Sequence, residues 1–340
     1  MNKKLKSFLE VLAVLVITFI VALTSVFNPW MNNAMTPVQE DILDIAHSVR
    51  EGFLAYTDLG GNYGPVIYEF YGLGYLLTDT HIVHFIMELV MVFFATLYMY
   101  KTAKLYTSEI FAMASAAILV IFGLGDLSSA GAEEIMFLFC TLTAYHVARQ
   151  LKYGFLSYHT YLLAIDTGIM FFIQPGYTIL WFVIIIFFAI MFMVIDLENN
   201  EYKAFWMSLL EGFVTVGIPM ALYLWYFRNG SDFLKQVVAY NFKNIGGLAE
   251  GLKIIIATPW SILILVLLLV IIIKTIKGDS IMDLCCWLGL IAVAIFVIAI
   301  QGDVSVHSIE LLKAFYIVPL ASAFSLVDKQ LGLSAEERKF

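Results

Sequence analysis

Charged residues are scarce in this chain. Asp, Glu, Lys and Arg make up 14% of its 340 residues, whereas 61% are hydrophobic. A soluble globular protein has about a quarter of its residues charged and about half apolar. The apolar excess lies in blocks long enough to cross a hydrocarbon core, which needs about 20 helical residues. The scarcity of charge therefore excludes an ordinary soluble fold and predicts one membrane domain over residues 1–340.

Cysteine and basic clusters are scarce as well. The three cysteines, Cys140, Cys285 and Cys286, all lie in apolar blocks and show no metal-ligand spacing, so we interpret them as small apolar helix residues. The net charge of −8 comes from dispersed acids. Because no basic stripe is present, no nucleic-acid partner is expected.

The apolar blocks predict an all-α polytopic membrane protein with about 10 transmembrane helices (roughly 9 to 11). The block that begins at Phe8 follows three lysines and looks like the start of a signal peptide. It is too long for a typical signal h-region and has no clear cleavage site, so we expect a retained first helix. The predicted crossings are 8–28, 81–101, 109–124, 134–149, 156–173, 177–196, 204–227, 254–273, 281–300 and 309–327.

Lys and Arg set the expected orientation. With the N-terminus inside, 13 of the 19 fall on the cytoplasmic side, as the positive-inside rule requires. We therefore expect a multi-pass plasma-membrane protein with both termini in the cytoplasm. The six on the outer side are Arg50, Arg228, Lys235, Lys243, Lys253 and Lys313.

Residues 65–77 are apolar but short, with two glycines and a central Glu69. A full crossing there would reverse every later loop and place Lys101, Lys104 and Arg149 outside, against the rule. We therefore place this segment at the outer interface or as a re-entrant piece.

Two external loops stand out, 29–80 and 228–253. The first contains an expected amphipathic helix from Pro37 to Glu51. Its apolar residues follow helical spacing and can lie on the membrane, while its polar residues face elsewhere. The apolar set is Ile42, Ile45, Ala46 and Val49, and the polar set is Asp41, Asp44, His47 and Glu51.

Four motifs gather on the predicted outer side. One is Asp41 with Asp44 and His47, one helical turn apart. Another is the run from Tyr56 through Asp58 and Tyr63 to Gly64-Pro65. The third is Glu133-Glu134, which follows a Gly/Ser-rich turn over 123–131 and opens a helix. The fourth is the turn Gln174-Pro175-Gly176-Tyr177.

Converging carboxylates outside the membrane can act as a general base on an acceptor hydroxyl or hold a divalent cation. Neighbouring cations and amides can hold a phosphate leaving group. This chemistry suits a lipid-linked donor whose head group sits at the interface. The candidate ligands of Mg²⁺ or Mn²⁺ are Asp41 and Glu133, and the candidate phosphate-binding cations are Lys235, Lys243 and Lys313.

Simpler interpretations stay open for each motif. The acids of 37–51 are also typical of the solvated face of an interfacial helix. Glu133-Glu134 also suits a helix N-terminus through the helix dipole, and Gly64-Pro65 also suits an ordinary turn. Acids inside or near crossings, such as Glu88, Asp166 and Glu211, are functional candidates because their burial in lipid is costly.

The motifs in order resemble the GT-C superfamily of membrane glycosyltransferases, especially bacterial members similar to family 39 and the protein O-mannosyltransferases. In those relatives an acid follows the first helix, and then come a short amphipathic helix ending in Gly, a Tyr-x-Asp pair, a Gly-Pro and a later acidic pair. The matching residues here are Asp41, Gly52, Tyr56-Thr-Asp58, Gly64-Pro65 and Glu133-Glu134. GIMFFIQPGYTILW from Gly168 and the segment His307 to Leu320 are also similar. The resemblance covers about 35–185 well and the rest loosely.

The resemblance implies a polyprenyl-phosphate-sugar donor, inverting transfer on the extracytoplasmic face and Asp41 as base. It also implies Glu133 and Glu134 as catalytic acids. Substrate contacts would come from Asp44, His47, Tyr56, Asp58, Tyr63 and Gln174. Two departures matter, because relatives commonly carry Lys at the position of Tyr63 and Arg or Lys at the position of Gln174.

Three functions remain in view. The leading hypothesis is transfer of a sugar from a polyprenyl-phosphate carrier to an envelope polymer, lipid or protein. The second is a non-catalytic subunit that binds a lipid-linked glycan or a membrane-protein partner, motivated by Tyr63 and Gln174. The third is a transporter or flippase, motivated by the membrane-embedded acids, although the halves show no convincing repeat.

Overall fold

The computed structural model describes residues 3–31, 33–122, 130–195, 198–302 and 306–331. Within these ranges the regular structure is helical, apart from one isolated bridge between Gly246 and Gln301. The longer helices are α1 (Lys3–Ala22), α2 (Pro37–Arg50), α3 (Pro65–Gly74), α4 (Ile82–Ala103), α5 (Glu109–Ile121), α6 (Ala132–Tyr153), α7 (Ser157–Phe171), α8 (Thr178–Val194), α9 (Asn199–Tyr226), α12 (Leu248–Ala257), α13 (Ile262–Ile276), α14 (Met282–Ala299) and α16 (Lys313–Leu331). The short ones are η1 (Pro175–Tyr177), α10 (Gly230–Phe233), the π-helix η2 (Leu234–Ala239), α11 (Tyr240–Lys243), η3 (Pro259–Ser261) and α15 (Val306–Glu310).

Six helical segments of the described chain are long and apolar enough to cross a membrane: Lys4–Ala22, Ile82–Ala103, Pro175–Val194, Asn199–Tyr226, Pro259–Ile276 and Met282–Ala299. Their outward faces carry large apolar side chains, such as Phe8, Ile186 and Ile276, which are 62%, 56% and 79% exposed. So much exposed apolar surface is unusual for a soluble monomer. It fits a protein embedded in lipid.

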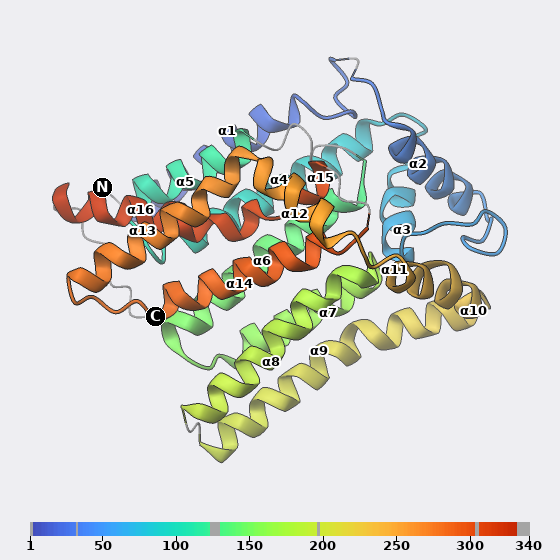
Figure 1. Cartoon of the computed structure of the whole chain (residues 1–340). Helices are drawn as coiled ribbons and strands as arrows, with labels where there is room; N and C mark the ends of the chain where they lie inside the picture. Colours follow the sequence, from blue (N-terminus) through green and yellow to red (C-terminus); the bar gives the residue numbers. More distant parts are fainter. Residues whose placement is uncertain (1–2, 32, 123–129, 196–197, 303–305, 332–340) are drawn as a thin grey trace.

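The long helices run side by side between two ends of the molecule (Figure 1). α1 begins and α16 ends at the left of this view, whereas α2, α3, α10 and α11 gather at the right. We call the right side the α2 end and the left side the opposite end. α16 lies among α4, α5, α6, α13 and α14, and its first half is almost completely buried.

Several helix boundaries differ from the sequence prediction. α1 ends at Ala22, six residues before the end of the predicted span 8–28. The span 254–273 is divided between α12 and α13, because Thr258 precedes Pro259 and adopts an extended conformation. The proline ring disfavours helical geometry at the residue before it. The Gly/Ser-rich turn lies outside the described residues over 123–129.

The predicted amphipathic helix is α2, which begins with a capping box. The Thr36 hydroxyl accepts a bond from the Gln39 amide, and the Gln39 side chain accepts one from the Thr36 amide at 2.6 Å. Ile42, Ile45 and Ala46 are buried. The sequence predicted that this face lies on the membrane, but it packs against α3. The reason is that the segment after the loop folds back as a second short helix.

α3 is the segment that the sequence left ambiguous. It has 10 residues, so it is only about 15 Å long. A hydrocarbon core is about 30 Å thick, which means that α3 is too short to cross it. Gly64 precedes the helix and Pro65 occupies its first turn, where proline is well tolerated.

Candidate functional site

Asp41 lies on the exposed face of α2, near the buried Tyr68 of α3. Burial is the main reason why the pKa of the Tyr68 hydroxyl is well above its ordinary value, and the Asp41 charge adds to the rise. The hydroxyl is therefore a permanent donor at neutral pH, and it receives a bond from the Tyr63 amide at 3.4 Å. An exposed carboxylate beside this buried tyrosine can accept a proton as a general base.

Asp44 and His47 lie farther along α2, beside Tyr75. The His47 ring packs edge-on against the Tyr75 ring with 4.8 Å between centroids. Its nitrogens lie 4.0 Å from the Glu51 and Asp79 carboxylates. Burial raises the pKa of the Tyr75 hydroxyl, and the Asp44 charge contributes. These residues form a polar surface that continues from Asp41.

The Tyr-x-Asp segment forms a tight loop between α2 and α3. Tyr56 adopts a left-handed backbone conformation with φ 71°, which costs a bulky residue energy. Its hydroxyl donates to the Tyr63 carbonyl at 2.8 Å. The Asp58 carboxylate accepts a bond from the Leu54 amide at 2.8 Å, so Asp58 closes a turn. The structure therefore gives Tyr56 and Asp58 a positioning role within the loop.

The second predicted external loop packs onto the first. The Gln236 side chain donates to the Tyr56 carbonyl at 2.6 Å, and the Asn241 side chain donates to the Asn62 carbonyl at 3.4 Å. The Phe233 ring lies 5.9 Å from the Tyr56 ring. Lys235 and Lys243 belong to this loop and are exposed. The two long loops thus form one layer at the α2 end.

The Gly64-Pro65 motif docks directly on the turn that carries Gln174. The Gly64 amide donates to the Ile173 carbonyl at 2.7 Å, and the Val66 amide donates to the Phe172 carbonyl at 3.2 Å. A Cβ atom at Gly64 would lie 1.9 Å from the Phe172 oxygen, so only glycine fits. Gln174 is half-buried, and its Oε1 has no hydrogen-bond partner among the described residues.

Glu133 reaches the same turn from α6. Ser308 of α15 donates to its carboxylate at 3.4 Å and also hydrogen-bonds the Tyr177 hydroxyl. Tyr63 and Tyr177 lie within electrostatic range of each other. Ser308 therefore joins the acidic pair of α6 to the Gln174–Tyr177 turn.

Glu134 points to a different neighbour and is buried. It accepts a hydrogen bond from the Tyr71 hydroxyl at 2.9 Å, and the same hydroxyl lies 2.9 Å from the Gly131 carbonyl. Glu88 of α4 lies within electrostatic range and accepts a bond from Ser25. Glu134 Oε1 has no hydrogen-bond partner among the residues that the structure describes. Glu134 thus anchors α6 to α3.

Lys313 does not lie among these residues. It is buried, pairs with Glu310 and stands over the Trp260 ring at 4.7 Å. Its charge is therefore balanced inside the helix bundle, which lowers the cost of burying it. Among the sequence-predicted phosphate-binding cations, Lys235 and Lys243 are the exposed ones at the α2 end.

No cluster of three or more His, Cys, Asp or Glu side chains in the described chain is arranged to hold a metal ion. Asp41 is exposed on α2, and Glu133 is half-buried at the start of α6. α3 lies next to both regions: its Tyr68 is near Asp41, and its Tyr71 donates a hydrogen bond to Glu134, the neighbour of Glu133. A Mg²⁺ or Mn²⁺ site of Asp41 with Glu133 stays a prediction.

Sequence reasoning missed the residues that link the motifs. Tyr68 and Tyr71 lie in a segment interpreted only as apolar, and Ser25 and Ser308 are small and common residues. The spacing of the two tyrosines, one helical turn apart, was the available signal. The bond from the Tyr223 hydroxyl to Glu69 at 2.5 Å had no signal, because the residues are 154 positions apart.

A scan of protein-family models and searches of curated proteins and of solved structures found no match for this chain.

Proposed function

We propose that the chain is a membrane glycosyltransferase with its site at the α2 end. It moves a sugar from a polyprenyl-phosphate carrier to a cell-envelope acceptor, which is a polymer, a lipid or a protein. The observation that carries the proposal is convergence. The Tyr56–Pro65 loop, the Gln174–Tyr177 turn and Glu133-Glu134 meet through direct contacts at one end of the bundle, and Asp41 is exposed beside Tyr68 at that end.

The proposed topology has ten crossings and an external α2 end. The six apolar segments are joined by α5, α6, α7 and α16 as the remaining crossings, with both termini in the cytoplasm. Two features support this arrangement. α3 is too short to span, and helix ends at the opposite end, such as the start of α1, the start of α9 and the end of α13, carry or adjoin lysines, as the positive-inside rule requires of a cytoplasmic face.

The chemistry uses Asp41 as the base. As the acceptor oxygen forms its bond to the anomeric carbon, the Asp41 carboxylate takes the acceptor's proton, and the bond between that carbon and the phosphate oxygen breaks. Attack from the face opposite the phosphate inverts the anomeric centre. The polyprenyl phosphate leaves as an anion, and Lys235 and Lys243 on the covering loop supply positive charge at this end.

A groove beside the site supports a lipid donor. It has a volume of about 640 Å³, lies between α1 and α4, and is lined by apolar side chains such as Leu15, Phe19, Ile86 and Phe93. A second hollow of about 520 Å³ lies at the α2 end of the same helices, and its lining includes the polar residues Asn28, Thr80 and His81 beside apolar residues such as Phe27 and Trp30. Apolar chain and polar head thus have adjoining surfaces.

Turnover by the purified chain tests the proposal. The full chain in lipid nanodiscs is incubated with radiolabelled polyprenyl-phosphate hexoses and an envelope extract, and release of polyprenyl phosphate is measured. Asp41→Asn is expected to lower the rate at least about 100-fold, as loss of a general base does. The matched control is Glu40→Gln, the neighbouring exposed acid on α2. Full activity of Asp41→Asn would remove Asp41 from the mechanism.

A non-catalytic subunit that binds a lipid-linked glycan is the second candidate. Tyr63 and Gln174 are neutral residues at positions where relatives of the resembled family carry cations. Lys313 pairs with Glu310 and therefore does not replace those cations, which favours this candidate. Binding of the radiolabelled lipid without turnover, in wild type and in Tyr63→Lys with Gln174→Arg, supports this candidate. Turnover by the wild-type chain alone excludes it.

A further inference from the structure

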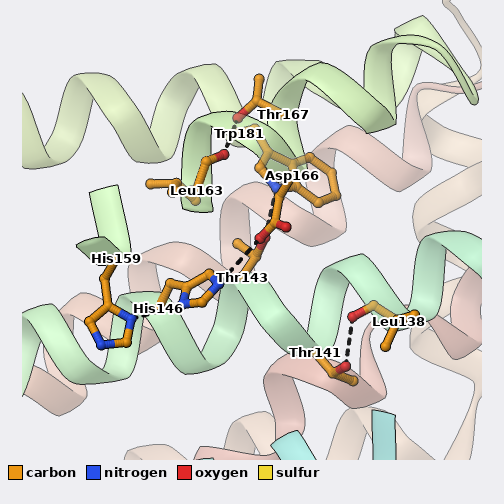
Figure 2. A network of polar contacts seen from close by, with 9 residues as sticks. All are labelled: Leu138, Thr141, Thr143, His146, His159, Leu163, Asp166, Thr167 and Trp181. Carbon is orange, nitrogen blue, oxygen red and sulfur yellow. Dashed lines mark hydrogen bonds and ion pairs between the residues drawn. The ribbon is translucent and has the colours of Figure 1, made fainter. Parts of the chain in front are cut away.

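A second polar network lies between α6 and α7 (Figure 2). His159 stands in the first turn of α7, and its Nδ1 lies 2.9 Å from the Nδ1 of His146 on α6. The other ring nitrogen of His146 lies 3.8 Å from the Asp166 carboxylate. All three side chains are buried. Together these three side chains form a row of titratable groups, the file, which runs inward from the start of α7.

The Asp166 end of the file is held by neutral groups. Thr143 donates to the Asp166 carboxylate at 3.0 Å, and the Trp181 indole donates to Thr143 at 2.7 Å. Asp166 lies seven residues after His159, which is about 10 Å along the helix axis. Burying an ionised carboxylate at that depth costs free energy, and a proton donor close to the carboxylate lowers this cost. His146 is the described side chain placed to supply one.

We infer that His159, His146 and Asp166 form a proton relay that opens at the opposite end of the bundle and stores one exchangeable proton at Asp166. A bond between two Nδ1 atoms requires one imidazole to donate and the other to accept. With Asp166 ionised, His159 Nδ1–H donates to His146, whose own proton sits on Nε2 and faces Asp166. In this arrangement both N–H groups point from His159 toward Asp166.

Proton uptake then reverses that direction. His159 Nε2 takes a proton from solvent, His159 passes its Nδ1 proton to His146, and His146 passes its Nε2 proton to Asp166. The number of protons in the file rises by one, the carboxylate becomes neutral, and both imidazoles have exchanged tautomers. The last transfer needs the 3.8 Å gap to shorten by about 1 Å, to ordinary hydrogen-bond length.

The surroundings favour entry beside His159. Tyr158, the residue before it, is 65% exposed, and the two rings pack edge-on. Arg149 lies on the same side of α6, and its positive charge opposes a second positive charge on the His159 ring. At the inner end, Tyr98 of α4 and Cys140 of α6 are the titratable groups near Asp166.

Among the described residues, the other elements packed against the file carry one nearby cation, Lys101 of α4, which stands 4.6 Å from the Tyr98 ring centroid. Tyr145 of α6 lies edge-on to the His159 ring, and Trp181 represents α8. On α9, Glu211 is exposed. On α16, Lys313 pairs with Glu310 and Asp328 with Thr107. Beside its own three members, the charged side chains nearest the relay in the described chain are therefore Arg149 and Lys101.

Histidine tautomers in the wild-type chain give the first test. The full chain with ¹⁵N-histidine is placed in lipid bilayers and its ring nitrogens are followed by solid-state NMR between about pH 8 and pH 5. His146 and His159 are assigned by subtraction with His146→Gln and His159→Gln. Opposite tautomers that exchange places on acidification support the relay. Identical tautomers at both pH values, or a fixed pair that never exchanges, overturn it.

Infrared difference spectroscopy gives the second test. Acidification is expected to produce a carboxylic C=O band that Asp166→Asn removes and Glu134→Gln, a change at the other buried acid, retains. His159→Gln is expected to slow hydrogen–deuterium exchange of that band at least about tenfold, with Tyr158→Phe as control. An Asp166 band that exchanges equally fast without His159 would refute the relay. Both tests are independent of glycosyl transfer.

Discussion

At the scale of single residues, the acids picked out from the sequence have different surroundings. Asp41 is exposed, Glu133 shares Ser308 with Tyr177, and Glu134 is buried under Tyr71. The sequence singled out these acids as candidates from their types and order. It could not separate exposed from buried acids, because Tyr71 and Ser308 lie 63 and 175 positions from the carboxylates they bind.

Tyr71→Phe is expected to destabilise the fold by about 1–3 kcal/mol, because it removes a donor from the buried Glu134 carboxylate. Thermal unfolding in detergent measures the effect, with Tyr75→Phe at the C-cap of α3 as the control. Replacing both partners, with Tyr71→Phe and Glu134→Met, should recover most of the loss, since no buried carboxylate is then left without its donor. If Tyr71→Phe were as stable as Tyr75→Phe, the bond would have no structural importance.

At the scale of elements, the short helix α3 determines the arrangement of the α2 end, because it packs against α2 there. The sequence predicted a short, non-spanning segment from the charge rule, and the 10-residue helix has that length. Its partners were not predictable, because the apolar face of α2 was assigned to the membrane. The broken span of α12 and α13 was missed for a related reason. Hydropathy does not detect a turn at Thr258-Pro259 inside a continuous apolar run.

Gly64→Ala is expected to destabilise the protein by about 3 kcal/mol or more, because the new methyl group would overlap the Phe172 carbonyl. Yield and melting temperature in detergent measure the effect. Gly217→Ala on α9 is the matched control, since nothing lies near its added Cβ. A variant with alanine at 64 that folds and melts like wild type would show that the two turns are not in tight contact.

At the scale of the whole molecule, the two long loops that the sequence marked as external pack on each other at one end. Their polarity indicated that both lie outside the apolar blocks. Their contact was not predictable, since it joins the chain between α2 and α3 to a segment after α9. Side-chain amides, which carry no distinctive pattern, make that contact.

Single-cysteine labelling tests the orientation. In a chain whose native cysteines are replaced by Ser, Asp79→Cys and Lys243→Cys at the α2 end should react with a membrane-impermeant maleimide on intact cells. Lys203→Cys and Lys277→Cys at the opposite end should react only after permeabilisation. All four native residues are exposed. Labelling of the second pair on intact cells would reverse the proposed orientation.

The bond from Gln236 to Tyr56 also has a consequence for biosynthesis. The two residues are 180 positions apart, and a ribosome adds roughly 5–20 residues per second. The first loop therefore waits on the order of ten to forty seconds for the segment that covers it. During that interval Tyr56, in its left-handed backbone conformation, lacks its final support, so this end of the protein cannot mature before the segment after α9 has been made.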